Sequence, residues 1–212
     1  MKKIITELDI VNLYRSGSAS IMIDSNTLVT PAAKDKINDL KIKIINPDSD
    51  SKKDVAESWI IKKKIAIGSD HTGYSIKEKL KRILIERGFS LVDVGTSSEE
   101  SCDYPDFANG VATNVIDNSV DFGIIIDATG IPSAITANKI NGVRAATCYN
   151  EFSAWSARAH NNANILVVGS KTLGEETIKS ILDKFIDSNF EGGRHQKRLD
   201  KIILIENKSS YK

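Results

Sequence analysis

Beyond about residue 57, short apolar runs alternate with longer segments in which apolar residues recur at helical spacing. Five of the short runs are typical of strands, namely KIAIG, SLVDVG, FGIIID, RAATC and NILVVG. The segments typical of helices are YSIKEKLKRILIERG, FANGVATNVIDN, PSAITANK, EFSAWSARAHN, GEETIKSILDKFID and GRHQKRLDKIILIEN. Strands that alternate with helices form βαβ units around a parallel sheet. The pattern therefore predicts an α/β fold: a three-layer, doubly wound, Rossmann-like domain with a five-stranded parallel sheet.

The N-terminal part of the chain has a different pattern, which predicts a small α+β module. A helix is expected around Glu7–Tyr14, strands at SIMI, TLVT and KIKII, and a second helix at PAAKDKINDL. Pro31 directly follows Thr30, which is typical of a capped helix start with proline at the first position. The segment NPDSDSKKDVAE is polar and charged, as linkers are. We predict a module over residues 1–45, a linker over 46–57 and the main domain over 58–212.

The composition limits which partners and which cellular location we expect for the protein. Lys and Arg number 29 against 28 for Asp and Glu, a net charge of +1, and a bulk nucleic-acid binder would show a basic surplus. No apolar run approaches the roughly 20 residues of a membrane span, and Glu7 and Asp9 interrupt the start of the chain, unlike a secretory signal. Cys102 and Cys148 have no CxxC spacing and are too few for a disulfide framework. We expect a cytoplasmic protein that binds neither nucleic acid nor membrane.

Polar residues gather where strands and helices end, at the edge where doubly wound sheets bind ligands. They are Asp70 and His71 after the first strand, Tyr104 and Asp106 after the second, Asp127, Thr129 and Gly130 after the third, His160 and Asn161 after the fourth helix, and Arg194, His195 and Arg198 at the last helix. Rare polar residues often fall in loops, but all three histidines of the chain do so here, which favours a site. The histidines show no HxxxH or HxxE spacing, so no metal site is predicted.

Arg194 and Arg198 are four residues apart, which places them on one face of the expected last helix. One interpretation is an ordinary solvated basic surface. The other is a guanidinium fork for phosphate, a dianion that arginine binds through two parallel hydrogen bonds. The preceding glycines would also leave helix N–H groups open to an anion.

These stretches together resemble the ribose-5-phosphate isomerase B family, which also contains the galactose-6-phosphate isomerase subunits. The matching segments, from about Lys63 to Glu206, are GSDHTGYSIKEKL, GTSSEESCDYPDFA, DFGIIIDATG with TANK, RAHNNANILVVGS and FEGGRHQKRLDKI. The resemblance implies an aldose–ketose isomerase of a phosphorylated sugar that uses neither metal nor cofactor. It also implies a homodimer or tetramer with shared active sites. The apolar last helix, with Leu199, Ile202, Ile203 and Ile205, is the segment expected to lie across a second subunit.

The resemblance assigns roles to individual residues. His160 would assist ring opening as acid and base, a task that suits a pKa near neutrality. Arg194 and Arg198 would hold the phosphate with His71 nearby. Thr129 would handle the hydroxyl protons. The other substrate-binding positions that the resemblance implies are Asp70, Tyr104, Gly130, Asn138 and Asn161.

The chain departs from the family pattern after the third strand. Typical members read C-G-T-G-x-G there, with the cysteine as the base that removes the carbon-bound proton, whereas Asp127–Pro132 reads DATGIP. A DA pair resembles a galactose-6-phosphate isomerase subunit. The Asp127 carboxylate is ionised at neutral pH but is a weaker base than a thiolate, and Pro132 has no N–H to offer an enediolate oxygen. Two hypotheses stay open: an isomerase with Asp127 as its catalytic base, or a catalytically silent subunit that binds sugar phosphate or a partner.

In the N-terminal module, VTPAAKDKINDLKIKI resembles a short segment found at the front of some bacterial microcompartment-associated enzymes. The resemblance implies that the module contacts a shell or a partner enzyme, and that the protein works inside a microcompartment. The alternative is a stabilising appendage that packs on the main domain. Both interpretations remain open.

Overall fold

The computed structural model describes residues 3–15, 20–24, 27–45 and 63–209. The chain divides into two compact units, Met1–Ile61 and Lys62–Lys212, and each is described by itself. The predicted linker over residues 46–57 lies outside the described residues. Within the described ranges, no helix is long and apolar enough to cross a membrane.

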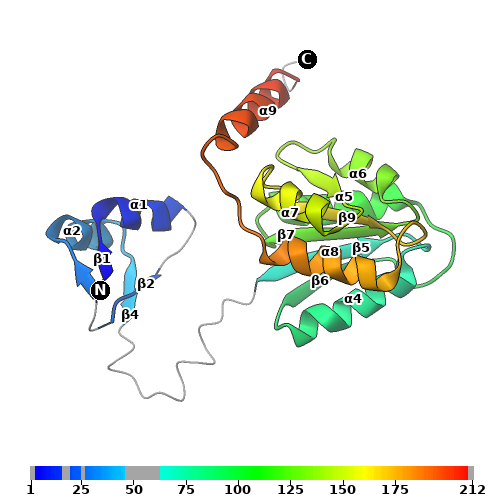
Figure 1. Cartoon of the computed structure of the whole chain (residues 1–212), viewed down its shortest axis with the longest axis horizontal. Helices are drawn as coiled ribbons and strands as arrows, with labels where there is room; N and C mark the ends of the chain where they lie inside the picture. The colour runs from blue at the N-terminus through cyan, green and yellow to red at the C-terminus, as the bar shows by residue number, and fades with distance from the viewer. Residues whose placement is uncertain (1–2, 16–19, 25–26, 46–62, 210–212) are drawn as a thin grey trace. The chain divides into compact units, whose positions relative to one another are not determined.

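The larger unit is built on a five-stranded parallel sheet with the strand order β6-β5-β7-β9-β8 (Figure 1). Its strands are β5 (Lys64–Ser69), β6 (Ser90–Gly95), β7 (Phe122–Asp127), β8 (Ala145–Thr147) and β9 (Ile165–Gly169). The chain moves outward from β5 to β6 and then turns back to β7, so the winding direction reverses between β5 and β7. The predicted sheet and all five predicted strands are confirmed, and the reversal marks the position at which such folds bind ligands.

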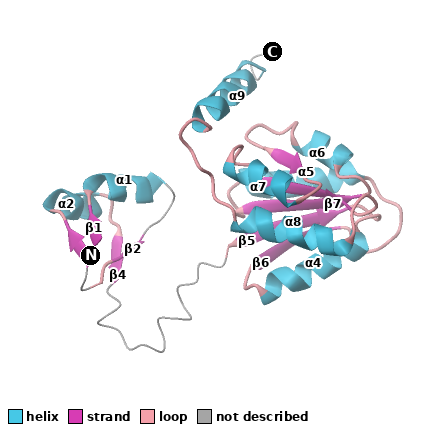
Figure 2. Ribbon diagram, viewed as in Figure 1, coloured by secondary structure: helices cyan, strands magenta, loops and turns pink. Residues whose placement is uncertain are grey.

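Helices cover both faces of the sheet and make three layers (Figure 2). They are α4 (Tyr74–Glu86), α5 (Tyr104–Ile116), α6 (Ile131–Ala137), α7 (Glu151–Ala159) and α8 (Glu175–Asp187). The last helix, α9 (Gln196–Ser209), lies outside these layers. Successive strand residues point to opposite faces. Ile65 and Ile67 accordingly belong to a core formed with α4, α7 and α8, whereas Ala66 packs in a second core with α5 and α6. This alternation explains why the strands read as continuous apolar runs.

The last helix begins later than the sequence predicted. Gly192 and Gly193 have φ values of 65° and 53°, in the left-handed region that favours glycine, and they form a turn before the first helical residue, Gln196. Arg194 therefore precedes α9, and the predicted helical face shared by Arg194 and Arg198 is wrong.

The smaller unit consists of two consecutive βαβ segments that interlock. The first comprises β1 (Lys3–Ile5), α1 (Glu7–Arg15) and β2 (Ser20–Met22), and the second comprises β3 (Thr27–Val29), α2 (Pro31–Asp39) and β4 (Lys43–Ile45). Strand β1 pairs in parallel with β3, and β2 with β4, so each two-stranded sheet takes one strand from each segment. The short strand β1 was not predicted.

Local capping explains where the second helix of this unit begins. The Thr30 side chain accepts a hydrogen bond from the Ala33 N–H, and Pro31 occupies the first turn, as the sequence predicted. The helix then buries Ala33 and Ile37 against Ile5 and Ile10. This small apolar core holds the two segments together.

Candidate active site

The carboxyl ends of β5, β7 and β9 are joined by hydrogen bonds at the point where the winding reverses. The Asp70 N–H donates to the Ile126 carbonyl at 3.2 Å. The Ser170 hydroxyl lies 2.9 Å from the Thr72 carbonyl oxygen and 3.0 Å from that of Asp127. The loops that carry the predicted residues Asp70, His71 and Asp127 are therefore neighbours.

The Asp70 side chain closes the turn that leads into α4. Its Oδ1 accepts hydrogen bonds from the Thr72 N–H at 2.9 Å, the Thr72 hydroxyl at 2.6 Å and the Gly73 N–H at 3.1 Å. Only 7% of Asp70 is exposed. In the free protein this carboxylate shapes the loop on which His71 sits, whereas the sequence predicted direct contact with substrate.

His71 contacts the loop that follows β6. Its Nδ1 accepts the Cys102 N–H at 3.3 Å, and the Cys102 Sγ lies 3.9 Å from the same nitrogen. Two residues further on, Tyr104 begins α5 and remains partly exposed. The contact brings the loops of two predicted residues, His71 and Tyr104, together at the edge of the sheet.

Asp127 ends β7 and is almost fully buried, with 1% of its surface exposed. Its Oδ1 accepts the Thr129 N–H at 2.8 Å and the Gly130 N–H, and its Oδ2 accepts the Ser133 N–H at 3.1 Å. Both oxygens of the carboxylate are thus occupied by backbone donors of the loop that begins α6. Pro132, which has no N–H, lies in the first turn of α6, where the missing donor costs little.

Gly130 allows the loop to close around the carboxylate. Its φ is 80°, and a Cβ there would lie 2.8 Å from the Thr147 Cγ2 and 3.2 Å from the Val168 carbonyl carbon. Only glycine fits this backbone conformation in this space. The adjacent Thr129 hydroxyl oxygen accepts the Ile131 N–H at 3.2 Å.

Asn138 and Asn161 use their side chains to hold the protein backbone. The Asn138 amide donates to the Ala145 carbonyl and accepts the Ala145 N–H, both at 2.9 Å, which extends the edge of the sheet at β8. The Asn161 Nδ2 donates to the Ser156 carbonyl at 3.0 Å. Both residues line a largely apolar groove of about 720 Å³ between α7, β8 and α9.

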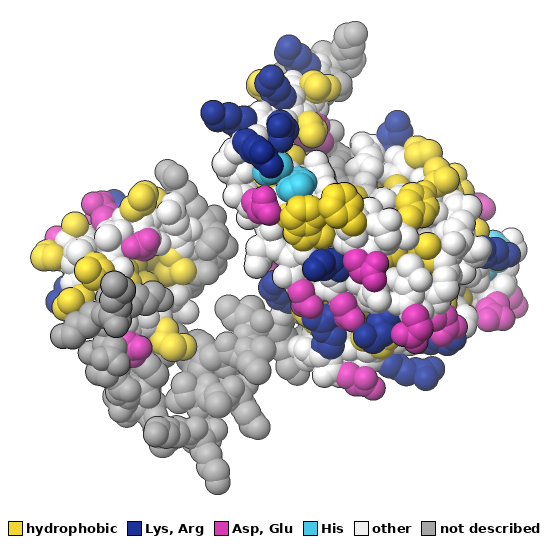
Figure 3. All heavy atoms as spheres, in the orientation of Figure 1, with side chains coloured by type: hydrophobic (Ala, Val, Ile, Leu, Met, Phe, Trp, Pro, Cys, Tyr) yellow, Lys and Arg dark blue, Asp and Glu magenta, His cyan; other side chains and the backbone are white. Residues whose placement is uncertain are grey.

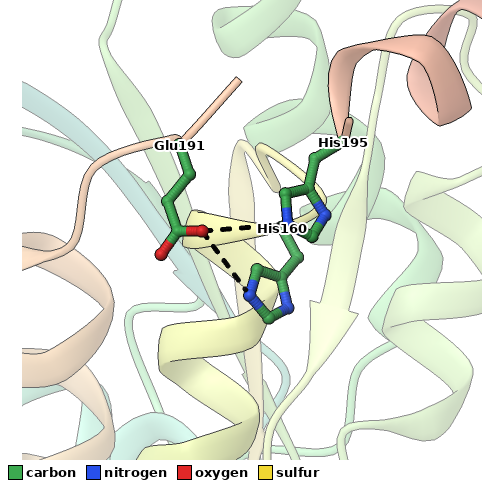
Figure 4. Close-up of side chains that lie close together, drawn as sticks. All are labelled: His160, Glu191 and His195. Atoms are coloured by element: carbon green, nitrogen blue, oxygen red, sulfur yellow. Dashed lines mark ion pairs between the residues drawn. The ribbon is translucent and has the colours of Figure 1, made fainter. Parts of the chain in front are cut away.

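His160 and His195 stack on each other beside one carboxylate (Figure 4). Their ring centroids are 4.2 Å apart and their planes differ by 4°. The Glu191 Oε2 lies 3.9 Å from the His160 Nε2 and 3.7 Å from the His195 Nε2. The Trp155 ring meets His160 edge-on at 4.6 Å, and the Ser156 hydroxyl oxygen lies 3.2 Å from the His160 Nδ1. Contacts with His195, Trp155 and Ser156 thus hold the His160 ring in place.

The two predicted arginines meet at His195. The Arg194 Nε lies 3.3 Å from the His195 Nε2, and the Arg198 Nη1 lies 3.4 Å from its Nδ1. Burial of the ring lowers the pKa of His195 below its ordinary value of 6.5. Positive charge on His160 and the two guanidinium groups lowers this pKa further, whereas Glu191 raises it. The lowered pKa favours the neutral form of His195, which has one acceptor nitrogen for the two guanidinium groups.

Glu191 was not predicted as a site residue, and His195 was named among the polar residues near the site without a role of its own. Both residues belong to a turn that contains two left-handed glycines. Because this turn is not helical, the spacing of the residues along the chain could not predict that they lie on one face. His160 comes from a different helix end, and the stacking partners are 35 residues apart in the sequence. Such a contact depends on the path of α8 and the following turn, which local patterns do not encode.

The atoms of His160, Glu191 and His195 lie close enough to hold a metal ion, all within 4.8 Å of one another. It is the one such group in the part of the chain that the structure describes. However, Arg194 points its Nε at the nitrogen that His195 would give to a metal. Figure 3 shows the histidines beside a group of Lys and Arg side chains. This surplus of positive charge opposes a cation and favours an anion.

Asp70, His71 and Asp127 lie at the carboxyl edge of the doubly wound sheet, where such folds bind ligands. His160, His195 and the two arginines follow α7 and α8 and lie at the opposite edge, beside the starts of β7 and β8, so the prediction that all these residues share one edge of a single chain is wrong. The fold and its anion-binding groups define an α/β protein of the doubly wound class. The chain belongs to the Ribose/Galactose Isomerase family, whose family model matches residues 65–202. The predicted family is thereby confirmed for the larger unit.

Individual relatives agree with this assignment. Ribose-5-phosphate isomerase B of Escherichia coli is 44% identical over 144 residues, which cover 68% of this chain and 97% of the relative. The structure of the Clostridium thermocellum ribose-5-phosphate isomerase B matches with a TM-score of 0.68 and 44% identity, covering 69% of this chain and 99% of that one. The Mycoplasma genitalium ribose-5-phosphate isomerase B, solved with bound ribulose-5-phosphate, matches with a TM-score of 0.66 and 44% identity over 68% of this chain and 96% of that one.

Proposed function

We propose that the protein is an aldose–ketose isomerase of a phosphorylated sugar, of the ribose 5-phosphate type or a related pentose or hexose phosphate. The observation that carries the proposal is the meeting of His160 with His195 and the two arginines, in a chain of this family. Guanidinium groups recognise phosphate, and an imidazole beside them can act on the sugar that the phosphate anchors.

In this mechanism the site is shared between two chains, because Asp127 and the group of His160 with the arginines lie at opposite edges of the sheet in one chain. Arg194 and Arg198 of one chain hold the phosphate, and its His160 moves a proton at the ring oxygen to open the sugar beside Asp127 of the other chain. Thr129 relays hydroxyl protons, and a base removes the C2 proton to give a cis-enediolate. Asp127 is the proposed base because it ends the central strand β7, where the family has its cysteine. Its burial and its three backbone donors mean that the loop must open for the substrate. On taking up the proton the carboxylate becomes neutral, which frees the Thr129 and Gly130 N–H groups for the enediolate oxygen.

A second candidate function is supported by the same hydrogen bonds. If the loop stays closed, Asp127 acts as a structural cap for α6, and the protein is a silent sugar-phosphate-binding or partner subunit. The occupied carboxylate and the missing N–H of Pro132 favour this alternative.

We propose further that the active unit is a homodimer or tetramer with shared sites. Four consecutive apolar residues of α9 are exposed in the single chain, namely Ile202, Ile203, Leu204 and Ile205. A helix that exposes such a row normally covers a partner. Light scattering of the full chain tests this, and a mass of one chain, 23.2 kDa, would contradict it.

Exchange of the C2 proton with solvent deuterium distinguishes the two candidate functions. The full chain is incubated with ribose 5-phosphate and with six-carbon aldose phosphates and followed by NMR, while calorimetry measures binding. Exchange supports the isomerase, and binding without exchange supports the silent subunit. Asp127→Asn is the matched variant, because its Oδ1 still accepts the Thr129 and Gly130 N–H groups but cannot take a proton. We expect a loss of about a hundredfold or more in kcat, and full activity would exclude Asp127 as the base.

A further inference from the structure

We infer that the Cys102 N–H fixes His71 in the tautomer that carries its proton on Nε2, which makes Cys102 a positioning residue. His71 then meets the substrate as a hydrogen-bond donor. The inference rests on the proposed function only for the identity of that substrate. The assignment of the tautomer rests on the geometry of the free protein.

The hydrogen bond determines where the proton lies. A neutral imidazole has one N–H donor and one acceptor nitrogen. Since the His71 Nδ1 accepts the Cys102 N–H at 3.3 Å, that nitrogen presents its lone pair and the proton is on Nε2. The Cys102 Sγ, at 3.9 Å from the same nitrogen, is a second potential donor on that side. A proton on Nδ1 would instead face a backbone N–H, which is repulsive.

The fixed tautomer suits the chemistry of a sugar phosphate. Phosphate and hydroxyl oxygens accept hydrogen bonds, so an Nε2–H can bind them, whereas a bare nitrogen would repel their lone pairs. Because the tautomer is already set in the free protein, the free energy of binding is not reduced by the cost of selecting it. The contact also joins the loop after β5 to the loop that leads to Tyr104. The backbone N–H provides this effect, so the thiol itself is dispensable.

NMR of the full-length protein with labelled imidazole nitrogens tests the assignment directly. The chain has only three histidines, and His71→Asn identifies the His71 signals by their loss. We expect the Nδ1 shift of an unprotonated nitrogen, and a scalar coupling across the hydrogen bond between that nitrogen and the Cys102 amide nitrogen. A protonated Nδ1, or no such coupling, would overturn the inference. This readout needs no sugar, so it stands apart from any failure of the isomerase assay.

Two substitutions at one position separate the backbone from the side chain. Cys102→Ala keeps the N–H and removes the thiol, so we expect the tautomer and the Kd for ribose 5-phosphate to be unchanged. Cys102→Pro removes the N–H, so we expect mixed tautomers and a Kd that is about three- to tenfold weaker. Thermal melting reports whether the proline variant is folded. If Cys102→Ala alone weakens binding, the thiol is the active group and the inference is wrong; if the proline variant fails to fold, the coupling in the wild-type protein decides.

Discussion

Some features of Asp127 could be predicted from the sequence, and others are visible only in the structure. Its place at the end of a strand could be predicted, because FGIIID is a continuous apolar run that ends in a carboxylate. Its partners could not be predicted, because they depend on the left-handed Gly130 and on the path of the loop into α6. The sequence therefore identified the position of the candidate base but not its hydrogen bonds.

Removing this carboxylate should destabilise the protein. Asp127→Ala leaves three backbone N–H groups of the buried loop without an acceptor, and we expect the free energy of unfolding to fall by about 2 kcal/mol. Asp127→Asn retains one acceptor oxygen and should lose less than half as much. Urea unfolding of the full chain measures both. Equal stability of the alanine variant and the wild type would show that the loop does not depend on the cap.

His195 should make stability depend on pH. Its pKa is lowered in the folded state, so the unfolded chain takes up the proton first as the pH falls. Stability attributable to this residue is therefore complete above 6.5, the ordinary pKa, and declines below it, down to the lowered folded pKa. We expect the midpoint of urea unfolding to drop as the pH falls below 6.5.

The control for this prediction is His195→Gln, which cannot titrate. Its unfolding midpoint should fall less over the same pH range. The outcome that contradicts the prediction is a parallel decline in the two proteins, since other groups would then account for the whole effect.

At the scale of elements, helices and strands were more predictable than their ends. The five strands of the larger sheet follow from apolar runs long enough to be recognised. Strand β1 has three residues, too few to show a period, and it exists because β3 pairs with it. Helix α9 starts after Arg194 because of the glycine turn, which overrides the helical spacing of its charges. Contacts between elements, such as the stacked histidines, lay beyond any local pattern.

An ion network around the buried Lys77 joins α4 to β6. Lys77 is 1% exposed, and its Nζ lies 2.7 Å from the Asp93 Oδ1 and 3.1 Å from the Glu78 Oε1. Burial raises the pKa of Asp93, but hydrogen bonds from Lys77 and Lys81 outweigh it and lower the pKa below 3.8. The network therefore stabilises the fold down to acidic pH and is lost as Asp93 becomes protonated.

Breaking this network should cost far more than breaking an exposed ion pair. Asp93→Ala leaves the Lys77 ammonium buried with only Glu78, and we expect a loss of about 3 kcal/mol in the free energy of unfolding. The matched control is Glu175→Ala, which breaks an exposed pair with Lys79 that joins α8 to α4. That loss should stay below about 1 kcal/mol. Similar losses in the two variants, measured by urea unfolding, would contradict the predicted role of burial.

For the whole molecule, the family match is confined to residues 65–202, and the smaller unit stands outside it. That unit has its own apolar core of Ile5, Ile10, Ala33, Ile37 and Ile42. Ile4 and Leu28, partners in the β1–β3 register, are both exposed. An independent core and an exposed apolar pair are compatible with the proposal that the module contacts a microcompartment shell or a partner enzyme. They leave open the alternative of an appendage on the main domain.

Deleting residues 1–57 tests these alternatives at the level of the whole chain. The larger unit retains its complete sheet, both apolar cores and every predicted site residue, so we expect the truncated protein to melt cooperatively and to keep its ribose 5-phosphate affinity within about twofold. Loss of the melting transition would show that the module is part of the main domain.

If the truncated protein stays folded, the substitutions Ile4→Glu and Leu28→Glu in the full chain test whether the exposed pair contacts a partner. These changes should leave melting and affinity unaltered while reducing co-sedimentation with purified microcompartment shells, because they put two charges where an apolar partner would pack. Unchanged co-sedimentation, or none in the wild type, would rule out a shell contact through this pair.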